Sequence, residues 1–212
     1  MDGYRTVRNA AEAAFVERHS RFIGYICPVQ IEAQALDFIA RIRKKHPDAT
    51  NNVYAYILRE QNKMRYSDDG EPQGTAGLPV LQVLKNEQLT DVAVVATRYF
   101  GGVLLGGGGL VRAYTHTAKI AVDAGERVYM QPCDLCTARC TYPLYDGVLR
   151  LIRQVGATVT DTQFTDSVEL SMYLPSDRLD MLQKALDEQT AGQVQLQKNG
   201  QKCMPVPLEK EV

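Results

Sequence analysis

Apolar residues recur every three or four positions in five parts of the chain, which is the spacing that places them on one face of a helix. Within residues 31–45, Ile31, Ala35 and Phe38 share such a face, and the helix is expected to end before Pro47. The same spacing predicts helices at about residues 78–85, from Leu110 to Val122, at residues 144–155, and around Leu179, Leu182 and Leu186.

Shorter apolar or alternating segments predict the strands. Residues 53–58 and 92–96 are continuous apolar runs typical of buried strands, and residues 168–174 alternate apolar and polar positions. Residues 13–28 are predicted to form a hairpin with its turn at Arg18-His19-Ser20, although the local composition also allows a helix from Ala10 to Arg18. Further strands are predicted at residues 135–142, 157–164 and 194–198.

The order of these elements predicts an α+β fold in two domains. Residues 1–130 are expected to form an α+β sandwich with its helices on one face of the sheet. Residues 131–200 follow the order β-α-β-β-α-β, which is that of a ferredoxin-like sandwich. Residues 125–132 are the predicted boundary, and residues 201–212 are predicted to be a loose tail.

The run from Gly101 to Gly109 contains six glycines in nine positions, just before the helix predicted from Leu110. Because glycine loses much backbone freedom on folding, such a run indicates left-handed dihedrals, a close backbone approach or a ligand held on bare amides. The amides and dipole at a helix start suit phosphate or carboxylate. A tight turn with close helix–sheet packing is the alternative. The spacing fits neither a Walker A loop nor a dinucleotide-binding fingerprint.

Charged and aromatic residues beside the glycine run complete an expected anion-binding site. Two arginines would add positive charge, and two tyrosines are available to stack on a base. The candidate residues are Arg98, Tyr99, Gly101, Gly102, Gly106, Gly107, Gly108, Gly109, Arg112 and Tyr114.

A second unusual run, residues 66–77, precedes the helix at residues 78–85. Three carboxylates lie within four residues, at Asp68, Asp69 and Glu71, which is more than the capping of one helix requires. Part of the loop is expected to be structural, with Thr75 or Gly77 as the helix cap, and the carboxylates are candidates for binding Mg²⁺ through water. The candidate residues of this acidic loop are Ser67, Asp68, Asp69, Glu71, Thr75 and Gly77.

Both runs resemble the signature motifs of a known family. The first motif is Ser67-Asp68-Asp69-Gly70-Glu71-Pro72-x-Gly74-Thr75-Ala76-Gly77, and the second begins Arg98-Tyr99-Phe100-Gly101-Gly102 and continues to Tyr114. Together they are similar to the motifs of the IMPACT family, which includes a bacterial YigZ-like branch. The similarity covers roughly residues 4–125, and the remainder resembles the small carboxy-terminal domain of bacterial members.

The resemblance carries expectations about fold and role. It implies that the first domain is like the second domain of ribosomal protein S5, and that the second is like a carboxy-terminal domain of translation elongation factors. It favours strands over a helix near residue 13. It also implies a translational regulator. One departure concerns catalysis: the family often has His-Asn-Cys where this chain has Asn51-Asn52-Val53, so a Cys-His pair cannot operate there.

Composition excludes several classes of protein. The chain is 45% hydrophobic and 23% charged, and no stretch approaches the ~20 apolar residues of a membrane span. The amino terminus lacks a signal-peptide core, so a cytoplasmic location without membrane contact is expected. Residues 1–130 carry a net charge of +2 and residues 131–212 one of −3, so any nucleic-acid contact has to be local.

The five cysteines do not indicate a disulfide framework. Cys133, Cys136 and Cys140 have the spacing of a partial metal site, but a fourth nearby ligand is missing and Cys203 is distant in sequence. Buried structural thiols are therefore favoured over zinc or an iron–sulfur cluster. Apart from magnesium, no cofactor is expected.

The sequence and the resemblance predict one function and leave a second as the alternative. The first is a translation-associated binding protein that contacts RNA, the ribosome or a translation factor through the glycine run. The second is an enzyme or binder for a phosphorylated or carboxylated small molecule, with Asp68 or Glu71 as a base or magnesium ligand and with Thr75 and Arg98 stabilising negative charge. His116 is expected on the exposed face of its helix, solvated rather than catalytic. The sequence does not indicate an oligomeric state.

Overall fold

The computed structural model describes residues 3–207, and its contacts divide them into two compact units, Tyr4–Tyr129 and Met130–Val206. The predicted α+β class is confirmed, because both units combine helices with antiparallel strand pairs. The elements of the first unit are β1 (Tyr4–Val7), β2 (Ala11–Glu17), β3 (Ser20–Pro28), α1 (Glu32–Lys45), β4 (Asn51–Leu58), β5 (Lys63–Ser67), α2 (Gly77–Asn86), β6 (Val92–Tyr99) and α3 (Gly107–Ala124).

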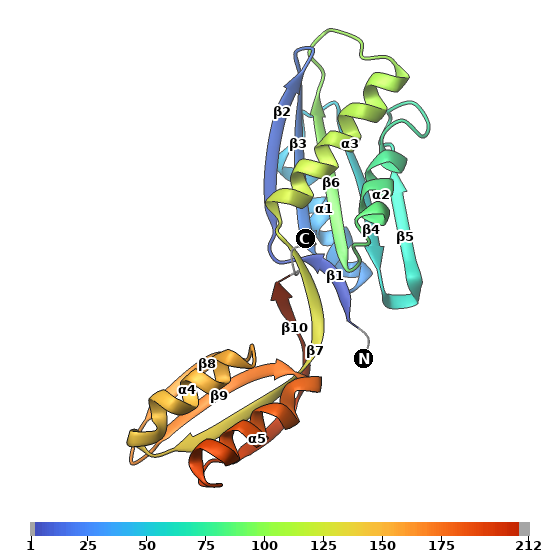
Figure 1. Cartoon of the computed structure of the whole chain (residues 1–212). Helices are drawn as coiled ribbons and strands as arrows, with labels where there is room; N and C mark the ends of the chain where they lie inside the picture. Colours follow the sequence, from blue (N-terminus) through green and yellow to red (C-terminus); the bar gives the residue numbers. More distant parts are fainter. Residues whose placement is uncertain (1–2, 208–212) are drawn as a thin grey trace. The chain divides into compact units, whose positions relative to one another are not determined.

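A five-stranded antiparallel sheet in the order β2-β3-β6-β4-β5 forms the centre of the first unit. Helix α1 covers one face of this sheet, and α2 and α3 cover the other (Figure 1). Along β6, Val94 and Ala96 pack towards α2 and α3, whereas Ala93 and Val95 pack towards α1. The prediction of helices on one face is therefore wrong. A strand that is apolar at every position must be covered on both sides.

The hairpin predicted near the amino terminus is observed as β2 and β3, paired from Ala11↔Ile26 to Glu17↔Ser20. Arg18 and His19 form the turn with positive φ angles of 44° and 66°, as a two-residue hairpin turn requires. The alternative helix over residues 10–18 is not formed. Strands β1 and β5 were not predicted. The side chains of β5 are exposed or only partly buried and show no apolar alternation, so only its pairing with β4 identifies it as a strand.

The second unit has the β-α-β-β-α-β order expected from the sequence. Strand β9 lies between β7 and β8, and β10 pairs with β7. Helices α4 and α5 pack with one face of these strands in a common core. The elements are β7 (Arg127–Cys140), α4 (Tyr145–Gln154), β8 (Thr158–Phe164), β9 (Val168–Pro175), α5 (Leu179–Thr190) and β10 (Leu196–Pro207), with short 3₁₀ turns at Glu60–Asn62, Tyr142–Leu144 and Ser176–Arg178 along the chain.

Two boundaries differ from those predicted. Strand β7 begins at Arg127, so most of the expected boundary loop at residues 125–132 is strand, and β10 extends to Pro207, so residues 201–207 are not a loose tail. Pairing between these two strands, rather than a local pattern, keeps both extended. Residues 208–212 lie outside the described part. From the sequence, Ser176 is also a candidate cap for the last helix, but its hydroxyl donates to the Asp134 carboxylate at 3.0 Å instead.

The cysteines of β7 are buried thiols, as predicted. Burial raises the pKa of Cys136 and Cys140 above the usual value. It is also the main cause that raises the pKa of Cys133 to about 11. They are therefore neutral packing groups at physiological pH. Within residues 3–207, no helix is both long enough and apolar enough to cross a membrane.

Gly24 of β3 allows α3 to approach the sheet closely. A Cβ atom at this position would lie 2.5 Å from the carbonyl oxygen of Thr117 and 3.0 Å from Cβ of Ala121. We therefore expect Gly24→Ala to lower the free energy of unfolding by about 2 kcal/mol, measured by urea denaturation. Gly108→Ala is the matched control, because a Cβ there meets nothing within 4 Å and alanine favours helix. Equal midpoints for Gly24→Ala and the unmodified protein would show that the packing is not tight.

Candidate functional site

Asp68 of the acidic loop caps the start of α2. Its carboxylate accepts hydrogen bonds from the backbone N–H groups of Gly74, Ala76 and Gly77 at 2.9, 3.1 and 2.8 Å. A carboxylate in this place satisfies otherwise unpaired amides and complements the helix dipole. The cap predicted at Thr75 or Gly77 is therefore supplied by Asp68, and the Thr75 hydroxyl donates to the Pro72 carbonyl instead.

Asp69 connects the acidic loop to α1 and β4. One carboxylate oxygen accepts from the Arg43 guanidinium at 2.6 Å, and the other accepts from the backbone N–H of Asn52 at 2.7 Å. Ser67 holds the same turn, because its hydroxyl accepts from the N–H of Asp69. This carboxylate is thus committed to holding the loop.

Glu71 lies at the centre of a buried polar cluster. One of its carboxylate oxygens accepts from the Arg98 guanidinium and from the Tyr114 hydroxyl, both at 2.7 Å. The side chains of Glu71 and Arg98 are each only 6% exposed. Burial, together with the adjacent Glu71 carboxylate, raises the pKa of Tyr114 far above its usual range, so the hydroxyl stays protonated and donates. The cluster joins the acidic loop, β6 and α3.

These contacts do not favour a shared magnesium site formed by the three carboxylates. Asp68, Asp69 and Glu71 bind three different sets of partners, so they do not converge on one point. Among the described residues, no group of three or more His, Cys, Asp or Glu side chains could hold a metal ion. Magnesium binding remains a prediction that these contacts do not favour.

Arg98 lies beneath the glycine run rather than in solution. Its Nη2 atom is 3.5 Å from the Ser20 hydroxyl, which also accepts from the N–H of Gly101 at 3.1 Å. Its Nε atom is buried and has no hydrogen-bond partner among the described residues. Arg98 and Tyr114 therefore lie on the inner side of the glycine run and support it there.

Tyr99 points to the opposite face of the sheet, because successive residues of a strand alternate sides. Its hydroxyl lies 2.7 Å from Nδ1 of His46, and the Tyr25 hydroxyl lies 2.6 Å from Nε2. Burial, and then the cations Lys45 and Arg21, lower the pKa of His46. The structure does not bring Tyr99 together with Tyr114.

The glycine run opens α3, as predicted. Gly106 precedes the helix with φ of 70°, and α3 begins at Gly107. Cβ atoms at Gly102, Gly106 and Gly108 would meet nothing within 4 Å, so these glycines face open space. Close packing, the alternative explanation, applies to Gly101, where a Cβ would collide with the backbone of His19. The first turn of α3 therefore presents bare backbone to solvent.

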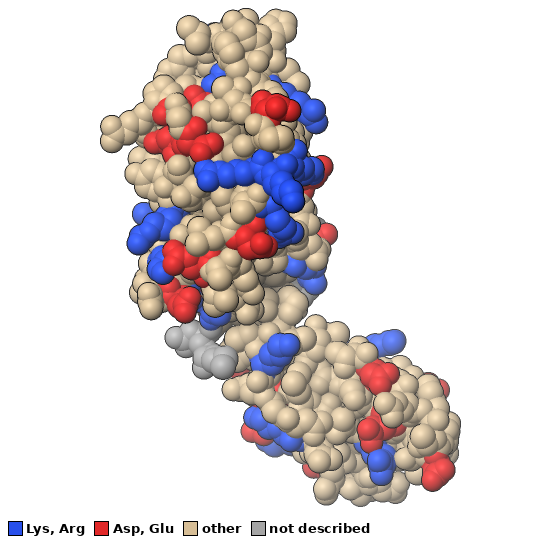
Figure 2. Space-filling model, turned by 180° about the vertical axis from the view of Figure 1, so that it is seen from behind, with Lys and Arg blue, Asp and Glu red and all other residues tan. Residues whose placement is uncertain are grey.

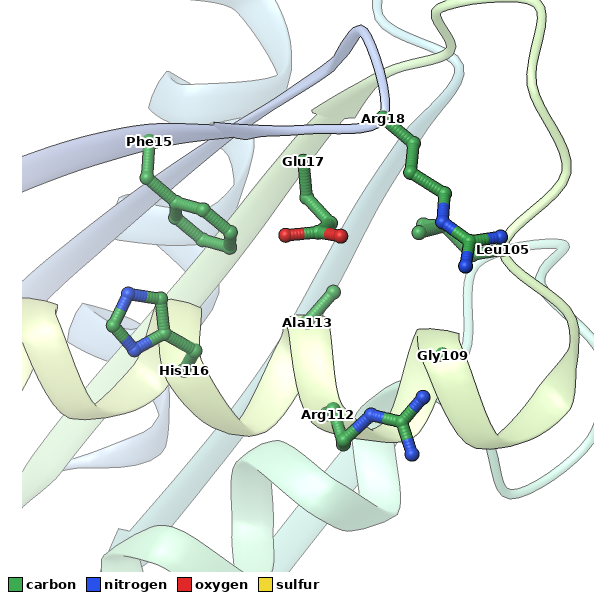
Figure 3. A pocket seen from close by; sticks show the side chains of 8 residues that line it. All are labelled: Phe15, Glu17, Arg18, Leu105, Gly109, Arg112, Ala113 and His116. Atoms are coloured by element: carbon green, nitrogen blue, oxygen red, sulfur yellow. The ribbon is translucent and has the colours of Figure 1, made fainter.

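A pocket of about 240 Å³ lies between the end of β2 and the first turns of α3 (Figure 3). Arg18 and Arg112 lie at the Gly109 end, and the rings of Phe15 and His116 lie at the other end. The complete lining is Phe15, Glu17, Arg18, Leu105, Gly109, Arg112, Ala113 and His116.

Of the residues that line this pocket, Gly109 and Arg112 were predicted from the sequence, whereas the residues from β2 were not. Phe15, Glu17 and Arg18 approach α3 only through the register of the hairpin, for which no motif gives a signal. His116 is exposed, as expected, but its ring also contacts Phe15 edge to face at 4.6 Å between centroids.

The basic end of α1 is largely neutralised. Arg43 pairs with Asp69 at 2.6 Å, Lys45 with Glu12 at 2.8 Å and Arg41 with Asp37 at 3.1 Å. Figure 2, which shows the face seen from behind, has acidic side chains beside the Lys and Arg side chains. These pairs favour a solvated helix end over a nucleic-acid patch.

Comparisons with known proteins establish the family. Residues 18–122 match the Impact N-terminal domain, and residues 139–193 match a second domain described only as being of unknown function. The chain is 33% identical over 193 residues to the IMPACT family member YvyE of Bacillus subtilis (strain 168), covering 91% of this chain and 89% of the relative. The chain belongs to the IMPACT family.

Other relatives agree with this assignment. The IMPACT family member YigZ of Escherichia coli (strain K12) is 31% identical over 192 residues, covering 88% of this chain and 94% of the relative. Protein IMPACT of Bos taurus is 35% identical over 94 residues, covering 42% of this chain and 30% of the relative. The crystal structure of a hypothetical protein matches 100% of both chains with a TM-score of 0.59 and 27% identity. The family predicted from the two motifs is confirmed.

The buried cluster makes a prediction about stability. Glu71→Gln leaves the buried Arg98 charge without a counterion, so we expect it to lower the free energy of unfolding by about 3 kcal/mol in urea denaturation. The double variant Glu71→Leu/Arg98→Leu is expected to lose less, because no isolated charge remains. Asp37→Asn, which removes an exposed ion pair of α1, is the control and should change little. A Glu71→Gln variant as stable as the control would contradict this role.

His46 makes a prediction about pH. Its pKa is lowered in the folded protein, so the unfolded chain binds a proton more readily. The stability that neutral His46 contributes is complete above its usual pKa of 6.5 and is lost as the pH falls through the lowered value. We expect His46→Gln to weaken the fall in melting temperature between pH 7.5 and pH ~5. His19→Gln, at an exposed turn, is the control. An unchanged pH dependence in His46→Gln would exclude this contribution.

Proposed function

We propose that this protein is a translation-associated binding protein that contacts RNA through the first turn of α3. The observation that carries the proposal is the open helix start beside two arginines. Gly108 meets no neighbouring atom within 4 Å on the side where a Cβ would stand, and Arg18 and Arg112 line the adjoining pocket. Unpaired amides, the helix dipole and guanidinium groups all favour a phosphate group.

Membership of the IMPACT family supports the link to translation, because the resemblance implies a translational regulator. The local arrangement of charge supports RNA as the ligand. The first domain has a net charge of only +2, so binding has to depend on a confined site of this kind. A cytoplasmic location follows from this proposal.

The acidic loop does not oppose RNA binding, although three carboxylates on one surface would repel phosphate groups. Asp68 bonds to backbone amides, Asp69 to Arg43, and Glu71 to Arg98 and Tyr114. Arginines therefore pair with Asp69 and Glu71, and the amides at the start of α2 stabilise the charge of Asp68, which weakens the negative field of the loop. The same contacts weigh against an enzyme that would use Asp68 or Glu71 as a base, because a base needs an uncommitted carboxylate.

Two substitutions test the proposal by fluorescence anisotropy with a labelled single-stranded RNA. Arg112→Ala removes one phosphate contact and is expected to weaken binding about tenfold. It should also reduce the slope of the logarithm of the binding constant against the logarithm of the salt concentration by about one. Gly108→Val places a branched side chain in the open space before the amides and is expected to abolish binding while thermal unfolding stays cooperative.

Lys119→Ala is the matched control for these variants. Lys119 is an exposed cation of the same helix, outside the pocket, so its loss should change the affinity little. Unchanged RNA affinity in both test variants, or equal losses in the control, would remove the α3 start from the function. A shift in melting temperature with phosphorylated metabolites and Mg²⁺, but not with RNA, would instead favour the small-molecule alternative.

A further inference from the structure

The pocket beside α3 contains charged groups that the fold does not use. In the part of the chain that the structure describes, no side chain forms an ion pair with Glu17 or Arg112. Within residues 3–207, the one hydrogen bond that Arg18 donates is long, 3.5 Å, and goes to the carbonyl of Leu104. With two guanidinium groups and one carboxylate, the pocket has a net charge of +1 when His116 is neutral. It therefore suits a ligand with one anionic group and a separate hydrogen-bond donor.

The lining residues are ordered along α3. Arg18 and Arg112 lie at the end near Gly109, Phe15 and His116 lie at the other end, and the Glu17 carboxylate points into the space between them (Figure 3). Arg112 and His116 are four residues apart, which is about 6 Å along a helix axis. This is close to the span from the phosphate of a nucleotide to its base.

The aromatic end forms a corner. The rings of Phe15 and His116 are 4.6 Å apart between centroids and meet at 77°. A flat base can therefore lie against the face of one ring and touch the edge of the other. His116 is exposed, so the corner is open to solvent. Stacking of this kind is possible with every base, so it contributes affinity but no selectivity between bases.

Glu17 would make the pocket selective between bases. An ionised carboxylate only accepts hydrogen bonds, so it favours a base with an exocyclic amino group. Cytosine, adenine and guanine carry such a group, whereas uracil carries a carbonyl oxygen where cytosine has its amine. A uracil carbonyl oxygen in the same place would face a second acceptor, so the hydrogen bond that the cytosine amino group donates would be lost.

We propose that this pocket holds one unpaired nucleotide of an RNA strand whose base carries an exocyclic amino group. The phosphate lies between Arg18 and Arg112 at the start of α3, the base lies against Phe15 and His116, and its amino group donates to Glu17. This inference rests on the proposed RNA-binding function and adds the choice of base.

The test compares two labelled RNA hexamers, oligocytidine and oligouridine, by fluorescence anisotropy at one salt concentration. The two bases have the same size and differ in one amino group, so the ratio of their affinities reports on Glu17. We expect oligocytidine to bind about tenfold more tightly, and Glu17→Ala to bring the affinities for the two hexamers to the same value. Glu12→Ala is the matched control, because Glu12 lies on the same strand but pairs with Lys45 outside the pocket.

His116→Ala is the second variant. It is expected to weaken both hexamers by a similar factor of about ten, because it removes a stacking surface and not the choice of base. Equal affinities of the unmodified protein for the two hexamers, or a preference that survives Glu17→Ala, would overturn the base choice and leave RNA binding standing. Absence of binding to both hexamers would overturn the proposed function and this inference with it. Cytidine monophosphate that binds as tightly as the hexamer would show that the ligand is a free nucleotide, which contradicts the proposal.

Discussion

The buried interaction between Glu71, Arg98 and Tyr114 is the constraint on which the rest of the first domain depends. It joins a loop, the central strand β6 and helix α3 at a single carboxylate oxygen, with Glu71 and Arg98 almost fully excluded from water. Charges in such a place are stable only as a complete set, because an isolated one would lose its hydration without a partner. The cluster therefore fixes the position at which β6 ends and α3 begins.

This arrangement explains how an acidic loop and an anion-binding helix start can occupy neighbouring parts of one domain. Asp68 satisfies the amides at the start of α2, and Glu71 neutralises the arginine beneath the glycine run. The negative charges are thus used inside the domain. The start of α3 keeps its unpaired amides, and the two arginines that line the adjoining pocket add positive charge there.

The sequence was sufficient to predict the features that depend on the local spacing of residues. Helical periodicity predicted the five α-helices of residues 3–207, and the glycines from Gly106 to Gly109 predicted the start of α3. The sequence was not sufficient to predict contacts between segments that are distant along the chain. Strand β5 has no apolar pattern, and nothing near Glu71 indicates that it pairs with Arg98. The alternation of a strand separates Arg98 from Tyr99, and hairpin register brings Phe15 and Glu17 to α3. Such relations become visible only when the sheet is assembled.

The most direct measurement of the central claim is the change in backbone amide NMR signals when a short single-stranded RNA is added to the ¹⁵N-labelled protein. If the open start of α3 binds phosphate, the largest changes will fall on Gly107, Gly108 and Gly109, and the amides that Asp68 already holds will change little. Changes confined to the basic end of α1 or to the second unit, with the α3 glycines unaffected, would contradict the account.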